Sequence, residues 1–401
     1  MNITGIITEY NPFHNGHLYH LNSLKEITNC DGVVCIMSGN FVQRGEPALV
    51  DKWKRTEMAL LNGVDLVIEL PTFYALSSAE FFAKGALSIL DSLGIINNIF
   101  FGSECDDINY LIKIAKYLTN ESDEMKKEIK ENLKKGITYA KARELSLIKI
   151  LNDKSLKTIL SNSNNILGIE YIKSLINLNS SITPLSLKRE GSKYNDEELT
   201  SLYASATSIR KNLKNNLPLH ELDGYLPVES LNILNSLKQE NYPFVFPEKM
   251  YPYIRYKLLS NCVDFNNLLE IKEGLDNKFL KEVYQSTSYE DLILRIKSKR
   301  YTYTKISRLM AQIFISLDKF SYIDLENHCN LYTRVLGFNN MGKLLLKEIK
   351  RNSKIPIITK MPKNVNNPLL NLDIQATKSY SILNNKINPL NDYLQSPIIK
   401  Y

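Results

Sequence analysis

Three of the five histidines in this chain, His14, His17 and His20, lie within seven residues of one another. Gly16 lies between the first two and allows the backbone to approach a ligand closely. Imidazole groups can donate hydrogen bonds to phosphate oxygens and stabilise the charge that develops as a phosphoanhydride bond breaks. A zinc site is disfavoured, because the helical His-Glu-x-x-His pattern and a third ligand are both missing. Ordinary surface-turn histidines remain the competing interpretation.

The elements around these histidines favour the phosphate hypothesis. Residues 3–7 form an apolar, β-rich run, and a helix is predicted from about residue 16 to residue 28. The free N–H groups and partial positive charge at a helix start suit a phosphate. In an open α/β sheet, ligands bind at the carboxyl ends of the strands. The motif occupies this position, so we predict a phosphate site in the first strand-to-helix turn.

The first hundred residues alternate short strands with helices. Strands are predicted at residues 3–7, 32–37, 64–70, 98–101 and 182–187, and helices at residues 16–28, 53–61 and 79–93. Nearly continuous apolar strands are typical of a sheet that is covered on both faces. The strict alternation predicts an α/β fold with a doubly wound parallel, Rossmann-like sheet.

The length of 401 residues favours two domains. We predict a catalytic α/β domain over residues 1–215 and a mainly α-helical domain over residues 216–401, because the strand signal fades beyond residue 215. The tail from residue 356 is rich in Asn, Pro and Ile and is expected to form short extended segments.

Bulk properties indicate a cytoplasmic protein without a membrane segment. No run of about 18 apolar residues and no signal-peptide pattern occurs. Five scattered cysteines without Cys-x-x-Cys spacing suit a reducing compartment. The net charge of +7 permits a polyanionic partner such as RNA, although a solvated basic surface explains it equally well.

A second segment could complete a phosphate site. Residues 205–210, Ser-Ala-Thr-Ser-Ile-Arg, are predicted to start a helix with Thr207 or Ser208 at the N-cap. Hydroxyls, free N–H groups and the Arg210 guanidinium suit phosphate oxygens. Alone the segment is a weak signal, because an isolated arginine is more often a surface residue.

Together these motifs resemble a known superfamily. His14-Asn15-Gly16-His17 is similar to the H-x-G-H signature of HIGH-type nucleotidyltransferases, and residues 205–210 are similar to their second signature. Residues 9–17, 37–48, 64–71, 100–104, 164–168 and 299–305 narrow the resemblance to the bacterial tRNA(Met) cytidine acetate ligase family. That resemblance implies an enzyme that forms acetyl-adenylate from ATP and acetate. It then makes N4-acetylcytidine at the wobble position of elongator tRNA(Met), releasing AMP and diphosphate.

The resemblance also implies the site residues. His14, His17 and Arg210 are expected to be catalytic, and Mg²⁺ is expected to accompany ATP. The expected ATP-binding residues are Ile7, Thr8, Glu9, Tyr10, Asn11, Pro12, Phe13, His14, Asn15, Gly16, His17, Leu18, Tyr19, His20, Gly102, Asn164, Arg189 and Ser208.

Three of these residues have ordinary alternatives on sequence grounds. Gly102 could leave room for an adenine or ribose, or simply end a strand. Asn164 could be a helix N-cap, and Arg189 could be a solvated rim charge. The role of Arg44, in the loop after the second strand, stays open among acetate, phosphate, RNA and an ion pair with Glu46.

The most basic stretch of the chain is residues 295–308. Lys299, Arg300 and Lys305 could neutralise RNA phosphates, and Tyr301 or Tyr303 could stack on an unpaired base. The alternative is a surface helix start whose apolar residues mark a buried face, and both can hold together. Two rival functions remain: a nucleotidyltransferase acting on a phosphorylated metabolite, and a non-catalytic RNA-binding protein.

Overall fold

The computed structural model describes residues 1–137, 139–189, 204–268, 270–272 and 274–401. The sheet strands are β1 (Ile3–Thr8), β2 (Gly32–Ser38), β5 (Leu66–Leu70), β6 (Asn98–Ser103), β7 (Thr183–Lys188), β8 (Thr333–Phe338), β9 (Ile357–Ile358) and β10 (Ile398–Ile399). The helices around them are α1 (Asn15–Thr28), α2 (Lys52–Leu61), α3 (Thr72–Ala75), α4 (Ala79–Ser92), α9 (Ser163–Asn177), α10 (Ala206–Lys214) and α17 (Asn340–Asn352).

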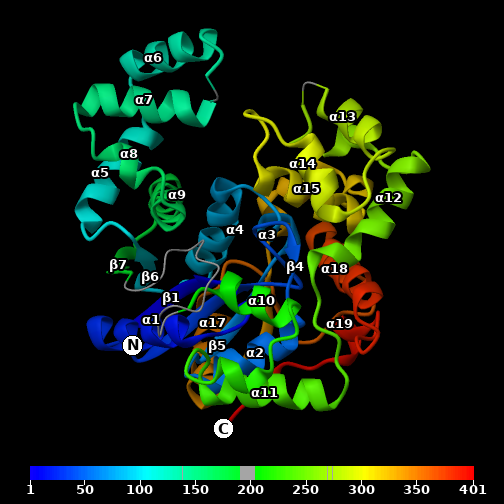
Figure 1. Cartoon of the computed structure of the whole chain (residues 1–401). Coiled ribbons are helices and arrows are strands. Elements are labelled where there is room, and N and C mark those ends of the chain that lie inside the picture. Colours follow the sequence, from blue (N-terminus) through cyan, green and yellow to red (C-terminus); the bar gives the residue numbers. More distant parts are fainter. Residues whose placement is uncertain (138, 190–203, 269, 273) are drawn as a thin grey trace.

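In the described part of the chain, eight strands form one sheet, in the order β10-β8-β5-β2-β1-β6-β7, with β9 beside β8 (Figure 1). Strands β5, β2, β1, β6 and β7 are all parallel. Every residue of β2 and β5 is buried, as their continuous apolar sequences predict. The predicted Rossmann-like parallel sheet is confirmed.

Close glycine contacts identify the helices on one face of the sheet. A side chain at Gly5 in β1 would contact Leu90 of α4, and one at Gly32 in β2 would contact Leu345 of α17. The strand register pairs Gly32 with Ile3, which points to the same face as Gly5 two residues later. Helices α4 and α17 therefore cover one face, and α9 joins them there by packing on α4.

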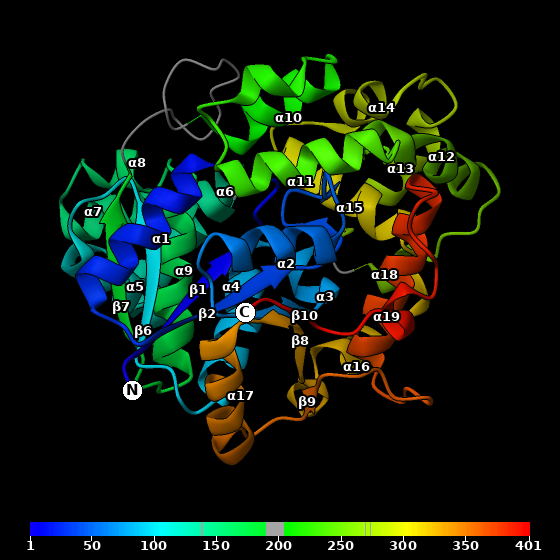
Figure 2. The ribbon, with the colours of Figure 1, turned by 90° about the horizontal axis from the view of Figure 1, so that it is seen from below.

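The other face carries α1 and α2. A side chain at Gly337 in β8 would contact Leu60 of α2. The register aligns Gly337 with Ile6, which points to the opposite face of β1. His20 of α1 contacts Phe100, which lies on that same face of β6. Helices thus cover both faces, as a doubly wound fold requires (Figure 2).

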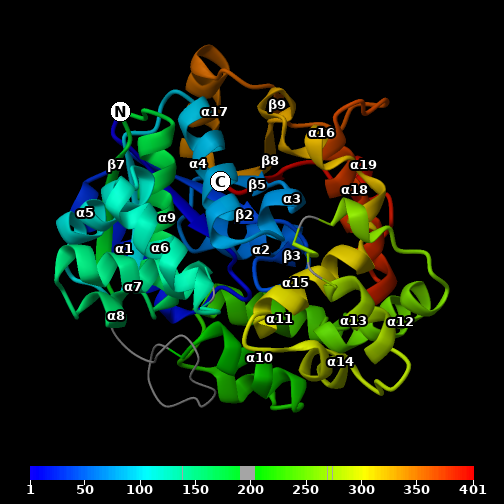
Figure 3. The same cartoon turned by 90° about the horizontal axis from the view of Figure 1, so that it is seen from above.

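Two helical units lie beyond the two sides of the sheet. The first comprises α5 (Ile108–Thr119), α6 (Asp123–Lys134), α7 (Tyr139–Leu151) and α8 (Leu156–Ile159). The second comprises α11 (Val228–Gln239), α12 (Tyr251–Leu259), α13 (Leu275–Glu282), α14 (Tyr289–Ile296), α15 (Tyr303–Phe314), α16 (Tyr322–Glu326), α18 (Pro368–Leu383) and α19 (Asn391–Leu394). Figures 1 and 3 show α5–α8 and α12–α15 on opposite sides of the molecule. Within the described residues, no helix is long and apolar enough to cross a membrane.

The C-terminal half is not helical throughout. Strand β8 pairs antiparallel with β5 and brings β9 and β10 into the same sheet. Strand β8 was not predicted, because residues 333–338 mix an arginine and a glycine with apolar residues and follow a helix-rich region. In the tail, β9 and β10 are short extended segments as predicted, but its longest element is the 16-residue helix α18.

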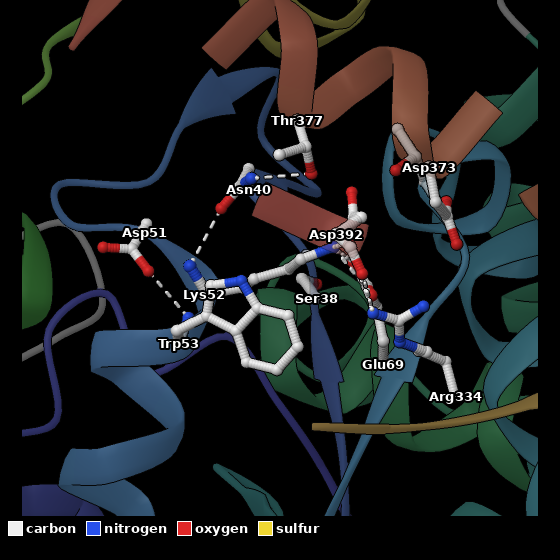
Figure 4. A network of polar contacts seen from close by, with 12 residues as sticks. Ser38, Asn40, Asp51, Lys52, Trp53, Glu69, Arg334, Asp373, Thr377 and Asp392 are labelled. Atoms are coloured by element: carbon white, nitrogen blue, oxygen red, sulfur yellow. Dashed lines mark hydrogen bonds and ion pairs between the residues drawn. The ribbon is translucent and has the colours of Figure 1, made fainter. Parts of the chain in front are cut away.

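A buried ion cluster fastens this C-terminal segment to the sheet (Figure 4). Lys52 Nζ lies 2.8 Å from Glu69 Oε1 and 2.7 Å from Asp392 Oδ1, and all three side chains are at most 2% exposed. Arg334 from β8 donates to the Asp392 carbonyl at 3.0 Å. Burial would lower the pKa of Lys52, but Asp392 and Glu69 together raise it. The four charges therefore compensate one another inside the core.

Candidate active site

His14 and His17 cap the start of α1 reciprocally. His14 Nδ1 accepts a hydrogen bond from the Gly16 backbone N–H at 3.1 Å, and His17 Nδ1 accepts one from the His14 N–H at 3.3 Å. The two rings stack with their centroids 3.7 Å apart. This is a capping box in which imidazoles replace the usual hydroxyl and carboxylate groups. The H-x-G-H spacing produces it, because the N-cap and N3 residues are three apart.

All three motif histidines are held neutral. Burial, with Arg189 and Arg210 nearby, lowers the pKa of His14 to about 3. Burial and Arg189 lower the pKa of His20 to about 4, and burial also lowers the pKa of His17 well below its usual value. Because Nδ1 of His14 and of His17 accepts an N–H, the neutral rings carry their hydrogen on Nε2. Each can therefore donate to a ligand without bringing a charge.

A cavity opens at the carboxyl ends of β1 and β6, above the start of α1. Most of the predicted ATP-binding residues line it, namely Ile7, Thr8, Glu9, Tyr10, Asn11, His14, Gly16, His17, Tyr19, His20, Gly102, Asn164 and Arg189, together with Arg210. Five predicted residues are absent from its lining: Pro12, Phe13, Asn15, Leu18 and Ser208. Asn15 instead binds the C-terminal half, donating its side-chain amide to the Gly224 carbonyl at 2.6 Å.

The N-cap of helix α10 lies earlier in the chain than predicted. Ser205 is the N-cap, and its Oγ accepts the Ser208 N–H at 3.0 Å. The prediction of Thr207 or Ser208 was wrong, because Ser208 is fully buried at N3 and donates its own hydroxyl to the Ser205 carbonyl. Residues 205–207 line the cavity in its place, so the helix start still faces the site.

Arg210 is fixed at the cavity by two contacts. Its guanidinium donates to the Asn11 carbonyl at 2.9 Å and to Glu46 Oε2 at 3.1 Å. The first contact joins α10 to the histidine turn, although about 200 residues separate them in sequence. The second contact pairs Glu46 with Arg210, and Arg44 of the same hairpin also lines the cavity.

Gly102, Asn164 and Arg189 all line the cavity. A Cβ at Gly102 would lie 3.2 Å from Arg189 Cγ, so the space that this glycine leaves is shared with the arginine. Asn164 is not an N-cap, because Asn162 precedes α9. Its side-chain amide donates to Glu104 Oε1 at 2.6 Å. Glu104 thereby orients a cavity residue, a role that sequence analysis did not assign.

A β-hairpin, β3 (Phe41–Val42) and β4 (Glu46–Pro47), connects the site with the C-terminal helices. Gln43 donates its backbone N–H to Glu9 Oε1 at 2.8 Å on the cavity side. On the other side, the Gly45 carbonyl accepts from Ser307 Oγ at 3.1 Å. Gly45 has φ of 80°, and a Cβ there would lie 2.2 Å from the Arg308 backbone nitrogen. Only glycine permits so close a contact between hairpin and α15.

The predicted RNA-binding segment lies next to this hairpin, at the start of α15. Lys299 and Arg300 are exposed, and Tyr301 and Lys305 are half-buried. Lys305 Nζ lies 5.3 Å from the centre of the Tyr301 ring. The apolar face predicted for this helix is confirmed, since Ile306, Leu309, Met310 and Ile313 are fully buried.

Arg55 holds three segments at the edge of the sheet and was missed in the sequence. It is fully buried in α2 and donates to backbone carbonyls of Glu9, Ser38, Gly39 and Val50. Four carbonyl contacts satisfy the guanidinium donors in the core. In the sequence Trp53-Lys54-Arg55 nothing distinguishes this arginine from the charges of an exposed helix.

Comparisons with known proteins agree with this geometry. The chain matches the family model HIGH Nucleotidyl Transferase over residues 1–393. It is 52% identical over 400 residues to the tRNA(Met) cytidine acetate ligase of Clostridium novyi (strain NT), with 99% of each chain covered. This chain belongs to the tRNA(Met) cytidine acetate ligase family. The family member from Clostridium tetani (strain Massachusetts / E88) is 48% identical over 404 residues, with 100% of each chain covered.

Solved structures extend the likeness to the whole fold of the family. Apo TmcAL from Thermotoga maritima superposes with a TM-score of 0.92 at 33% identity, covering 100% of this chain and 99% of that chain. A second structure of the Thermotoga maritima protein, bound with alpha-thio ATP, gives a TM-score of 0.89 at the same identity and coverage. A member of the family with this fold therefore binds an ATP analogue.

Proposed function

We propose that this chain activates acetate with ATP and transfers the acetyl group to the wobble cytidine of elongator tRNA(Met). The product is N4-acetylcytidine, with release of AMP and diphosphate. The observation that carries the proposal is the reciprocal His14–His17 cap, which turns two neutral imidazole donors towards one cavity in a member of this ligase family. Membership of the tRNA(Met) cytidine acetate ligase family supports acetate and tRNA(Met) as the other two substrates.

In the first step, an acetate oxygen attacks the α-phosphorus of ATP and diphosphate leaves. Nε2–H donors of His14 and His17 stabilise the charge that develops on the phosphoryl oxygens. Both imidazoles are neutral, so they add hydrogen bonds to the site without adding charge. Arg210 and Arg189 supply the positive charge, as their effect on the pKa of His14 indicates.

Magnesium would enter this site with ATP. Among the described residues, no three His, Cys, Asp or Glu side chains come together as a metal site. We therefore expect Mg²⁺ to be bound through the phosphates of ATP, where it would offset their charge.

In the second step, the exocyclic amine of the cytidine attacks the acetyl carbonyl of acetyl-adenylate. The RNA would reach the cavity past the hairpin, with Lys299, Arg300 and Lys305 contacting phosphates and Tyr301 close to a base. Gly45 supports this arrangement, because it holds the hairpin directly against the start of α15. On this proposal residues 1–215 carry the adenylation site and residues 216–401 contribute most of the tRNA surface, in the cytoplasm.

Acetate-dependent exchange of labelled diphosphate into ATP tests the first step without RNA. The expected result is exchange that requires acetate and is lost in a His17→Ala variant. Exchange that needs a phosphorylated metabolite instead of acetate would assign the chain to another nucleotidyltransferase reaction. An unchanged rate of tRNA acetylation in His17→Ala would show that the histidine turn is not catalytic.

A further inference from the structure

Transfer of acetyl to cytidine requires a proton acceptor. As the amine nitrogen N4 bonds to the acetyl carbon, it becomes positively charged and must release a proton. The bond between that carbon and the AMP phosphate oxygen then breaks, and AMP leaves as an anion. A general base aligned with N4 makes this step productive.

We infer that Glu9 is this proton acceptor: its carboxylate lies in the cavity beside the histidine turn, held on one oxygen and open on the other. Oε1 accepts the Gln43 N–H at 2.8 Å. Among the residues that the structure describes, no hydrogen-bond donor reaches Oε2 and no cation lies within 4.0 Å of the carboxylate. The inference rests on the proposed function, because it names the base for its second step.

The backbone under Glu9 is held rigidly. The buried Arg55 donates to the Glu9 carbonyl at 2.7 Å and to the Ser38 carbonyl at 3.0 Å. The Gln43 contact then fixes the side chain from the hairpin above. A carboxylate anchored at both ends suits a group that must meet one atom of a docked base.

The three histidines, Glu46 and Tyr10, which also line the cavity, are poor candidates. Nδ1 of His14 and Nδ1 of His17 already accept backbone N–H groups, and the pKa values of all three motif histidines are lowered. Glu46 is engaged by Arg210. Burial raises the pKa of Tyr10 well above its usual value, so its phenol stays protonated.

Glu9 itself has suitable acid–base properties. Burial raises its pKa, whereas the Gln43 N–H, Arg44 and Arg210 oppose that change. A carboxylate with a raised pKa is a stronger base once it is ionised. The charged and titratable groups that line the cavity with Glu9 are His14, His17, Tyr19 and His20 from α1, Tyr10 beside Glu9, Arg44 and Glu46 from the hairpin, Tyr171 from α9, Arg189 after β7, and Arg210 from α10.

The test separates the two half-reactions in a Glu9→Gln variant of the full-length protein. Glutamine keeps the Gln43 hydrogen bond through its side-chain oxygen but cannot take the proton. In single-turnover reactions of synthetic acetyl-adenylate with elongator tRNA(Met), transfer is expected to fall about 10²–10⁴-fold. Glu9 lines the ATP cavity, so acetate-dependent diphosphate exchange can also fall, but it is expected to fall at least about tenfold less than transfer, because adenylation does not use this base.

The pH profile of transfer gives a second readout that a purely structural role would not change. Wild-type transfer should lose rate as acid protonates Glu9, whereas Glu9→Gln should lack that acid limb. Protonation of His14 and His20 does not mask this acid limb of the pH profile, because their pKa values, about 3 and about 4, lie below the pH range of the assay. A Glu9→Asp variant, which keeps a displaced carboxylate, should retain the limb with partial activity.

Every result of the exchange and transfer assays either supports or contradicts the role of Glu9 as proton acceptor. Equal losses of exchange and transfer in Glu9→Gln would make Glu9 an ATP-binding or structural residue and overturn the inference, as would normal transfer. Absence of acetate-dependent exchange in the wild-type protein would instead defeat the proposed function. The two failures are thus distinguishable.

Discussion

The histidines of α1 and the ion cluster around Lys52 are both buried, and the two groups meet the cost of burial in opposite ways. In the first two turns of α1, three histidines stay neutral and line a cavity. Under α2, Lys52, Glu69, Asp392 and Arg334 keep their charges and neutralise one another. The difference separates a site that must accept a charged ligand from a cluster that only joins two parts of the chain.

Removing one partner from the ion cluster should have the largest effect on stability. A Lys52→Met variant removes the cation nearest to Glu69 and Asp392 and leaves Arg334 to balance two buried carboxylates, which costs about 3–5 kcal/mol of unfolding free energy. Urea unfolding measures this loss. A Lys54→Met variant is the matched control, because the Lys54 side chain is 39% exposed. A loss as small as that of the control would mean that the cluster does not hold the C-terminal segment.

Truncating a side chain of the histidine turn should reduce activity far more than stability. A His17→Ala variant is expected to lose about 10²–10³-fold in acetate-dependent exchange, because one donor to the developing charge is removed. Its unfolding free energy should fall by only about 1 kcal/mol, the usual effect of removing a helix cap. His220→Ala, at an exposed histidine outside the cavity, serves as the control. A large stability loss with unchanged exchange would reverse the roles assigned to the two regions.

The two regions should also respond to pH with opposite signs. The folded pKa of His14 is about 3, below its unfolded value of about 6.5, so the unfolded chain binds more protons between these values and stability rises with pH. Burial and Glu69 raise the pKa of Asp373, beside the ion cluster, to about 7. From its unfolded pKa near 3.8 up to about 7, its contribution to stability therefore falls as pH rises.

Urea unfolding across this pH range checks both signs. Each group contributes up to about 1.4 kcal/mol per pH unit within its window. A His14→Asn variant, whose side-chain oxygen can still cap Gly16, should lose the histidine contribution and so have a smaller positive slope. An Asp373→Asn variant should lose the opposing contribution and have a larger one. Unchanged slopes in both variants would contradict the assigned protonation states.

Removing solvent-exposed charges should have the smallest effect, and it should change RNA binding alone. A double variant Lys299→Ala, Arg300→Ala should lower the dependence of log Kd on log salt by about 0.7–0.9 for each RNA phosphate that the two side chains neutralise. Exchange without RNA should not change. The control is Lys343→Ala, Lys347→Ala on α17, where two exposed lysines lie on the other side of the molecule (Figure 3). Equal effects of the two pairs would remove the RNA role from residues 299–305.

Local patterns in the sequence predicted the parallel sheet and the histidine turn. The continuous apolar strands and the spacing of His14, Gly16 and His17 are both short-range signals, and the structure retains them with shifts of one or two residues. The resemblance to the acetate ligase family added the substrates, which spacing alone does not provide. The cap of α10 was misplaced because four hydroxyl-bearing or small residues in succession offer several equivalent starts.

Long-range contacts explain what was missed. The position of Arg55 is determined by hydrogen bonds to backbone carbonyls of three other segments. Residues 333–338 form strand β8 only because they pair with the edge of β5. Glu104 orients Asn164 across about 60 residues. In each case the residue type fits more than one environment, and the partner that decides between them is distant in sequence.

On the mechanism proposed above, the neutral histidine turn drives acetate activation for tRNA modification. Mass spectrometry of elongator tRNA(Met), incubated with the protein, ATP and acetate and then digested, tests it most directly. The proposal predicts one acetylated cytidine at the wobble position that requires both ATP and acetate and disappears with His17→Ala. Unmodified tRNA after incubation with folded, ATP-binding protein, or full acetylation by His17→Ala, would contradict it.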